Sequence, residues 1–196
     1  MVNHPPPPQL RSTRWQRWQR LARRIRIPLG FLTAGLYLFE LWRHAPQPAA
    51  IAWSALLVVP GLALRGYASG YVKKNRELTV TGPYAYTRNP LYLGTLLVAT
   101  GLAIASRSFG LGALFAAVFL LIYLPVIQLE EQHLRRLFAD YADYAAAVPA
   151  IWPRVPPARW GKPAAFRWTL YLRNQEYNAA AGFAAGLALL AWKVWR

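Results

Sequence analysis

The chain has 196 residues, 56% of them hydrophobic, and its 23 Lys and Arg against 7 Asp and Glu give a formal net charge of +16. It has no cysteine, which excludes disulfides, thiolate metal sites and a cysteine nucleophile. Because the apolar residues form long blocks flanked by cations, and no nucleic-acid motif is present, we expect a membrane protein whose cations face anionic lipids and not nucleic acid.

The first 26 residues predict a basic N-terminal region. Residues 1–9 contain four prolines and are expected to be a disordered tail. Arginine then recurs at every third position from Arg11 to Arg23, while Trp15 and Trp18 share an apolar stripe at helical spacing. This pattern predicts an interfacial amphipathic helix, and the alternative is a solvated basic tail.

Residues 27–196 are expected to form one membrane domain, so the predicted fold class is an all-α polytopic membrane protein with about five transmembrane helices and interfacial amphipathic helices. The candidate spans are 27–42, 46–64, 91–106, 109–129 and 178–192. Pro125 is expected to kink the fourth span. The fifth block is either a span or an interfacial segment, and its Gly182 and Gly186 predict a small-residue face for helix packing. Interfacial helices are expected after the fourth span and over 166–177.

The distribution of cations predicts the orientation. Five spans place 19 of the 23 Lys and Arg residues on one side, which includes the N-terminus, the loop 65–90 and the segment 130–177. By the positive-inside rule this side is cytoplasmic and the C-terminus is extracytoplasmic. We therefore expect an integral protein of a bacterial inner membrane.

Two motifs bracket the third and fourth spans: GPYAYTRNPLYLG from Gly82 to Gly94, and the acidic pair Glu130-Glu131. Within the first motif, Asn-Pro predicts a helix start, with Asn at the N-cap and Pro at the first helical position. Because the two spans form a hairpin, Arg88 and the acids should meet at one membrane face. A carboxylate at the end of an apolar helix is costly, which favours a functional role, although an ordinary helix pair of Glu131 with Arg135 is the alternative.

This combination resembles the superfamily of isoprenylcysteine carboxyl methyltransferases and phospholipid methyltransferases, over Arg65 to Pro153. One departure is Asn89, which stands where many members carry histidine and cannot shuttle a proton near neutral pH. The resemblance implies S-adenosylmethionine as cofactor and Arg88 and Glu130 as catalytic residues. The cofactor-binding positions that it implies are Arg88, Asn89, Pro90, Tyr92, Gly94, Glu130 and Glu131.

The expected reaction is methyl transfer to a lipophilic membrane acceptor. A carboxylate acceptor needs no general base, whereas an amine must lose a proton, which a glutamate can take. An alternative is an NADPH-dependent reductase of a sterol-like or enone-like lipid, with Lys73, Lys74 and Arg76 at the cofactor's phosphates. A further alternative, a noncatalytic scaffold, leaves the charged motifs unexplained. The sequence predicts no metal site and leaves the oligomeric state and the acceptor's identity open.

Overall fold

The computed structural model describes residues 13–43, 47–160 and 163–194, which form helices and loops without a β-strand. In chain order the helices are α1 (Arg14–Arg43), α2 (Pro48–Ser69), the 3₁₀-helix η1 (Gly82–Ala85), α3 (Pro90–Ser106), α4 (Phe109–Val118), the π-helix η2 (Phe119–Tyr123), α5 (Leu124–Leu137), α6 (Tyr141–Ala147), α7 (Trp168–Asn174) and α8 (Tyr177–Val194). The predicted all-α class is confirmed. The tail predicted at 1–9 lies outside the described residues.

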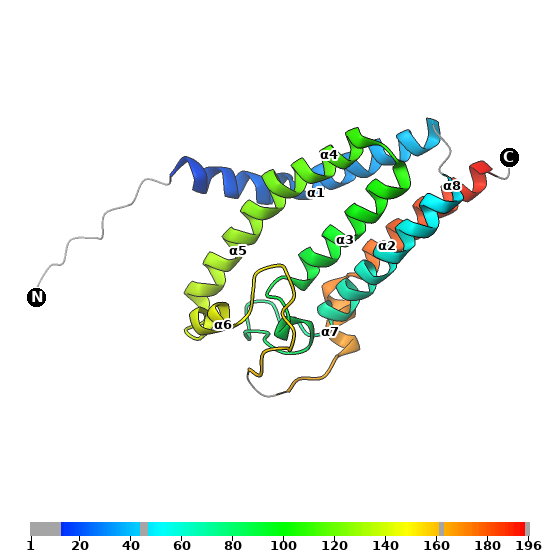
Figure 1. The fold of residues 1–196 in the computed structure, drawn as a ribbon. Helices are drawn as coiled ribbons and strands as arrows, with labels where there is room; N and C mark the ends of the chain where they lie inside the picture. The colour runs from blue at the N-terminus through cyan, green and yellow to red at the C-terminus, as the bar shows by residue number, and fades with distance from the viewer. Residues whose placement is uncertain (1–12, 44–46, 161–162, 195–196) are drawn as a thin grey trace, which may run out of the picture.

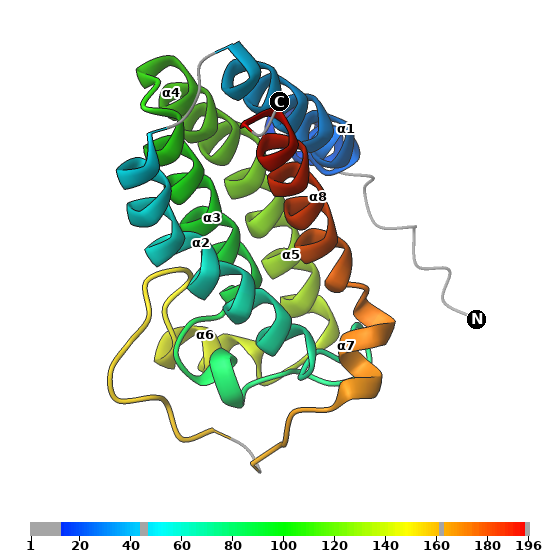
Figure 2. The same cartoon turned by 90° about the vertical axis from the view of Figure 1, so that its right-hand side faces the viewer.

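The long helices form a bundle with its short helices and loops at one end (Figure 1). α2 and α3 lie side by side, and α1 crosses α5 and η2 before it packs along α4. In the view turned by 90°, α6, α7 and the loops that join them gather at the end opposite the α3–α4 turn (Figure 2). We call this end the loop end. It holds the start of α3 and the end of α5.

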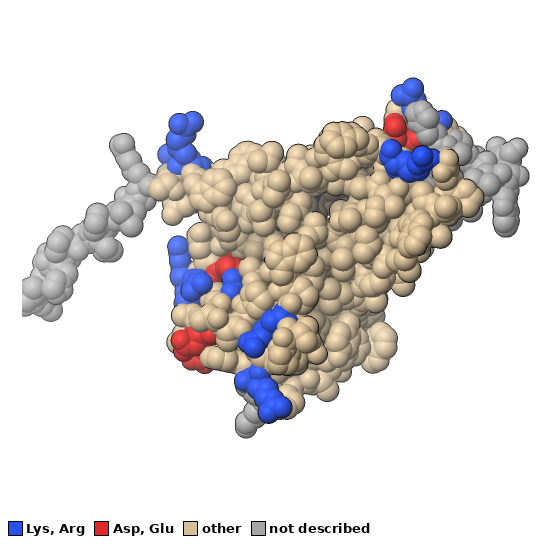
Figure 3. Space-filling model, viewed as in Figure 1, with Lys and Arg blue, Asp and Glu red and all other residues tan. Residues whose placement is uncertain are grey.

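The outer surface of the bundle is suited to lipid. α1, α2 and the continuous helix Phe109–Leu137 are each long and apolar enough to cross a membrane, and α3 is apolar but has only 17 residues. Phe31 and Phe109 are 76% and 91% exposed, a cost in water that a lipid environment removes. On the face seen in Figure 3, charged side chains lie at the ends and the middle is almost free of them. The chain is therefore a membrane protein, and the number of five spans stays a prediction.

α2 and α3 are held at short distance by glycines. A Cβ atom added to Gly94 would lie 2.6 Å from the carbonyl oxygen of Gly61, and one added to Gly101 would lie 2.8 Å from that of Ser54. These contacts are with backbone atoms, so a larger side chain would push the helices apart. The start of α3 is thereby fixed against α2.

The kink predicted at Pro125 takes the form of the π-helix η2, which directly precedes α5. Proline has no N–H to donate to the carbonyl four residues earlier, that of Leu121. The indole Nε1 of Trp18 donates to this carbonyl at 3.1 Å. η2 also brings the ring of Tyr123 to 5.9 Å from that of Tyr92 on α3, in an edge-on arrangement. Pro125 of α5 thus leaves a carbonyl without its helical donor, and Trp18 of α1 supplies the hydrogen bond in its place.

α1 differs from the expectation of an interfacial helix followed by a separate span. It is continuous from Arg14 to Arg43 and passes through Pro28. Ala22 is fully buried against Val126, and Trp18 packs on the same cluster. The apolar stripe is therefore covered partly by protein, because α1 crosses α5 at this point.

The last apolar block forms α8, which contacts α1 and α2. A Cβ atom added at Gly182 would meet nothing within 4 Å. The packing face predicted there is thus not in contact with another helix at Gly182. The preceding segment contains α7, at the loop end.

Candidate active site

The motif before α3 starts the helix as the sequence predicts, but one side chain is used differently. Pro90 occupies the first helical position, and Asn89 occupies the N-cap position without a capping bond from its side chain. Its amide nitrogen instead donates to Glu131 Oε1 at 3.1 Å and to the carbonyl of Ala150 at 3.0 Å. Asn89 therefore connects α3, α5 and the loop that follows α6.

Arg88 and Glu131 form a bidentate ion pair across the α3–α5 hairpin. The Nε–Oε1 distance is 3.0 Å and the Nη2–Oε2 distance is 3.2 Å. The two side chains are only 13% and 17% exposed. Glu131 thus pairs with a residue 43 positions away, while Arg135 lies over the ring of Tyr141 at 5.3 Å. The convergence expected of the hairpin is present, and the ordinary pair with Arg135 is not formed among the described residues.

Arg88 also fastens the loop after α6. Its Nη1 donates to the carbonyls of Ala145 and Val148, at 2.6 and 2.7 Å, and its backbone N–H donates to that of Pro149 at 2.9 Å. This side chain therefore holds the loop end together.

Two buried tyrosines of α6 lie beside this pair. Tyr144 donates its hydroxyl to the carbonyl of Tyr84 at 2.8 Å, and burial raises its pKa. Tyr141 is 1% exposed, and burial, followed by the charge of Glu131, raises the pKa of its phenol to about 12. Both phenols are neutral at physiological pH, so they add packing without adding charge.

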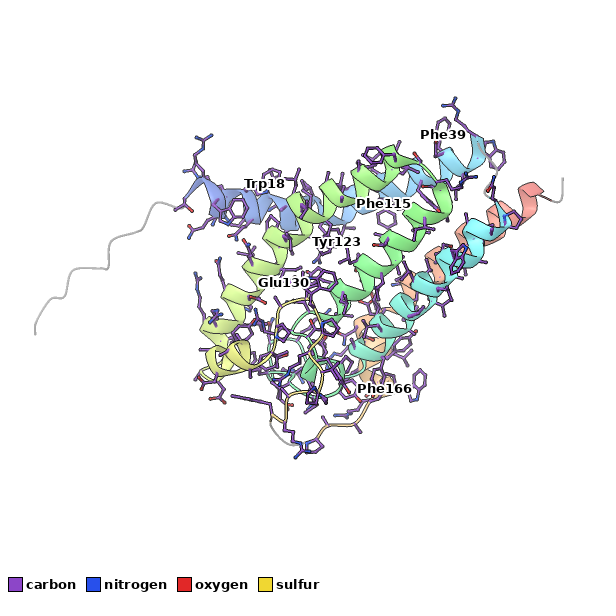
Figure 4. The ribbon with its side chains drawn as sticks, viewed as in Figure 1. Trp18, Phe39, Phe115, Tyr123, Glu130 and Phe166 are labelled. Atoms are coloured by element: carbon purple, nitrogen blue, oxygen red, sulfur yellow. The ribbon has the colours of Figure 1, made fainter. Side chains whose placement is uncertain are left out.

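Glu130 has a different environment from its neighbour. Its side chain is 39% exposed, and its carboxylate accepts a hydrogen bond from the hydroxyl of Tyr92 at 2.9 Å. Arg26 Nη1 lies 3.4 Å from Glu130 Oε1 and also donates to the hydroxyl of Tyr92. Figure 4 shows Glu130 on the side of α5 that faces α3. Of the two acids, Glu130 is the accessible one.

Sequence reasoning missed Arg26. It lies near the middle of α1, with its guanidinium 5.9 Å from the ring of Tyr92. Arg26 is the last cation before the first apolar block, so the predicted topology already placed it on the same side of the membrane as the acids. The sequence pattern gave no reason to choose it over the other N-terminal arginines as a site residue. The structure therefore adds one cation to the site, Arg26, which lies over the ring of Tyr92.

Gly94 lies away from the acids, in the contact of α3 with α2. Next to it, Arg65 on α2 pairs with Glu176 at 2.6 Å and donates to the carbonyl of Leu91 at 3.2 Å and to the hydroxyl of Thr95. Sequence reasoning missed this second, largely buried pair, which joins α2 and α3 to the segment before α8. The other predicted site residues therefore lie together at the loop end, whereas Gly94 packs against α2.

The fold and the site define the class of this protein: an all-helical membrane domain with a largely buried Arg–Glu pair beside a more exposed carboxylate. Within it, residues 50–141 match the family described as phospholipid methyltransferase. A protein-S-isoprenylcysteine O-methyltransferase of Schizosaccharomyces pombe is 30% identical over 129 residues, 65% of this chain and 49% of that protein. The resemblance to the superfamily of isoprenylcysteine carboxyl and phospholipid methyltransferases is confirmed.

Two further relatives have names that concern metal resistance. The cobalt-zinc-cadmium resistance protein CzcN of Cupriavidus metallidurans is 35% identical over 114 residues, 58% of this chain and 50% of that protein. The nickel-cobalt-cadmium resistance protein NccN of Alcaligenes xylosoxydans xylosoxydans is 40% identical over 89 residues, 45% of this chain and 41% of that protein. The matches thus span about half the length of these relatives or less. No solved structure matches the chain.

Proposed function

We propose that the protein transfers a methyl group from S-adenosylmethionine to a lipophilic acceptor, at the cytoplasmic face of a bacterial inner membrane. The observation that carries this proposal is the partly exposed carboxylate of Glu130, held by Tyr92 and Arg26 at the loop end. It lies within a segment that matches the phospholipid methyltransferase family. The cytoplasmic assignment rests on the positive-inside rule.

The side chains around Glu130 fit the charged groups of this cofactor. Arg26 contacts Glu130 through one nitrogen at 3.4 Å, so its other N–H groups suit the cofactor's carboxylate. The Arg26 guanidinium lies over one face of the Tyr92 ring, 5.9 Å from its centre, so a sulfonium would use the opposite face. Glu130 can accept hydrogen bonds from an ammonium group or ribose hydroxyls. When bound, the cofactor supplies an electrophilic methyl group.

The other predicted residues have a positioning role in this proposal, because they hold the backbone around the pocket in place. Pro90 starts α3, whose first free N–H groups suit an anionic group. Arg88, Asn89 and Glu131 keep that helix start beside α5 and the loop after α6. Gly94 sets the distance of α3 from α2. We propose that these residues position the pocket whose ligand contacts come from Glu130, Tyr92 and Arg26.

Methyl transfer is an in-line displacement, in which the new bond to the acceptor's oxygen or nitrogen forms as the carbon–sulfur bond breaks. The chain must mainly align the two reactants and exclude water. If the acceptor is an amine, Glu130 takes its proton; if it is a carboxylate, no proton moves. Asn89 cannot take a proton and Glu131 is paired with Arg88, so Glu130 is the carboxylate of this motif that we propose as the base.

A lipophilic acceptor agrees with the surroundings of Glu130. The rings of Tyr92, Tyr123 and Phe119 follow one another at centroid distances of 5.9 Å, from the acid toward the apolar middle of the bundle. An acceptor with an acyl or prenyl chain can approach along such a wall while a soluble cofactor enters from the water side. The printed name of the Schizosaccharomyces pombe relative, which refers to isoprenylcysteine, agrees with this class of acceptor.

The reductase alternative is not favoured, because the family match and the named enzyme among the relatives are methyltransferases. The test compares binding of labelled S-adenosylmethionine and labelled NADPH to purified protein, and then follows methyl incorporation into a membrane lipid extract and into water-soluble acids and amines. We expect binding of S-adenosylmethionine and label in the lipid fraction. Binding of NADPH alone, or label confined to soluble compounds, would contradict the proposal.

A further inference from the structure

A basic cavity lies at the loop end, outside the group of residues around the acids. It has a volume of about 550 Å³ and lies between the loop 72–77, which follows α2, and helix α7. The cations that line it are Lys73, Lys74, Arg76, Arg167 and Arg173. Glu77 is the one carboxylate in this lining, and Lys73 pairs with it at 2.6 Å. The lining thus offers no carboxylate to its other four cations.

The two walls of the cavity are fixed to each other by polar contacts. Asn174 of α7 donates its side-chain amide to the carbonyls of Ser69 and Val72, at 2.8 and 3.1 Å. The backbone N–H of Arg167 donates to the carbonyl of Gly70 at 3.0 Å. Because these bonds join segments about 100 residues apart, the backbone that carries the cations is held in place before any ligand binds, which lowers the cost of binding.

Aromatic packing adds to this connection. The ring of Phe166, which lies beside α7 in Figure 4, packs so closely on Gly70 that an added Cβ atom would lie 2.2 Å from it. The same ring stacks on Tyr67 of α2, with centroids 5.8 Å apart. A side chain in place of Gly70 would therefore displace the Phe166 ring from this contact.

The outer surface of α7 places this cavity at the level of lipid headgroups. Trp168 and Leu172 are 69% and 58% exposed, and each is adjacent in sequence to a lining cation, Arg167 or Arg173. Exposed tryptophan beside arginine is typical of the membrane–water interface. A ligand held here by its phosphate can lay its chains against these apolar side chains, which a free phosphate cannot use.

We propose that this cavity is a binding site for the phosphate group of an anionic phospholipid. Basic pockets at the cytoplasmic ends of transmembrane helices recognise such headgroups by charge. The site is distinct from the acid pair, since neither Glu130 nor Glu131 lines it. It adjoins α5 through the loop, because Asn75 contacts His133 at 3.2 Å. A bound lipid would hold the loop end at the surface of an anionic leaflet.

The experiment measures retention of phosphatidylglycerol and phosphatidylcholine by the purified protein in neutral detergent, using native mass spectrometry. The wild type should prefer phosphatidylglycerol. Arg76→Gln combined with Arg173→Gln should weaken its binding about 30-fold, the factor expected when two cations near a membrane surface are removed. The matched control removes two exposed cations outside the cavity, Arg20→Gln with Arg136→Gln, and should change binding less than threefold.

Glycerol 3-phosphate is a soluble probe that distinguishes a site for a lipid phosphate from a site for a free phosphate compound. It should compete with phosphatidylglycerol only at far higher concentration, because it has no acyl chains; equal competition would overturn the lipid assignment. Equal lipid binding by wild type and cavity variant, or an equal loss in the control, would overturn the site itself. A second cavity variant, Lys74→Gln with Arg76→Gln, changes only the loop 72–77. It replaces the variant Arg76→Gln with Arg173→Gln if the latter has a lower melting temperature than the wild type.

Discussion

Replacing Arg88 by methionine should destabilise the fold strongly. The change removes both contacts to Glu131 and the hydrogen bonds to the carbonyls of Ala145 and Val148. It leaves Glu131, whose side chain is only 17% exposed, without its cation. Breaking a buried ion pair by removing one partner costs about 3–5 kcal/mol. For a chain of this size, that loss lowers the melting temperature by roughly 6–20 °C.

The assay is thermal unfolding of the purified protein in detergent, followed by tryptophan fluorescence. The double variant Arg88→Met with Glu131→Met should be more stable than Arg88→Met alone, because neither charge is then buried without a partner. Glu130→Gln is the matched control. The Glu130 side chain is 39% exposed, so the expected change in the free energy of unfolding is within about 1 kcal/mol. The reasoning would be refuted if Arg88→Met melted at the same temperature as the wild type. It would also be refuted if the loss of stability in the double variant equalled the sum of the losses in the two single variants.

Three further predictions concern packing, orientation and the acceptor. Gly94→Ala should destabilise the fold by about 1–3 kcal/mol, because the added Cβ would lie 2.6 Å from a backbone oxygen of α2. Gly182→Ala is the control and should not destabilise it, since its Cβ meets nothing within 4 Å; equal melting temperatures of the two variants would contradict this. Lys73→Cys and Arg154→Cys should react with a membrane-impermeant thiol reagent from the same side, and reaction from opposite sides would exclude the topology. Ala99 lies seven residues after Tyr92 in α3, on the same face of the helix, so Ala99→Phe should raise the apparent KM for the lipid acceptor and leave cofactor affinity unchanged. The reverse pattern would exclude an acceptor path at this position.

The start of α3 and the meeting of the two motifs were predictable from local chemistry. Asn-Pro before an apolar block determines a helix start almost alone, because proline suits the first turn and little else in a helix. Two uncharged spans joined by a short turn must bring their outer ends to one side of the membrane. The pairing of Arg88 with Glu131 agrees with that expectation.

The remaining parts of the site depend on packing that periodicity does not encode. Arg26 reaches Glu130 only because α1 crosses α5, a crossing stabilised by Trp18 on the carbonyl freed by Pro125. Besides its pair with Glu131, Arg88 donates to the backbone carbonyls of Ala145, in α6, and Val148, just after it, and any sequence supplies such carbonyls. Arg65 and its partner before α8 are 111 residues apart, so no local pattern connects them.

The most direct test of the central claim is equilibrium binding of S-adenosylmethionine to the wild type and to Glu130→Gln. If Glu130 receives the donor's charged or hydroxyl groups, its neutral variant should bind roughly 10- to 150-fold more weakly, as for the loss of one charge-assisted hydrogen bond of about 1.5–3 kcal/mol. Its melting temperature should stay close to that of the wild type. Equal affinities of the two folded proteins would contradict the assignment of Glu130 to the cofactor site.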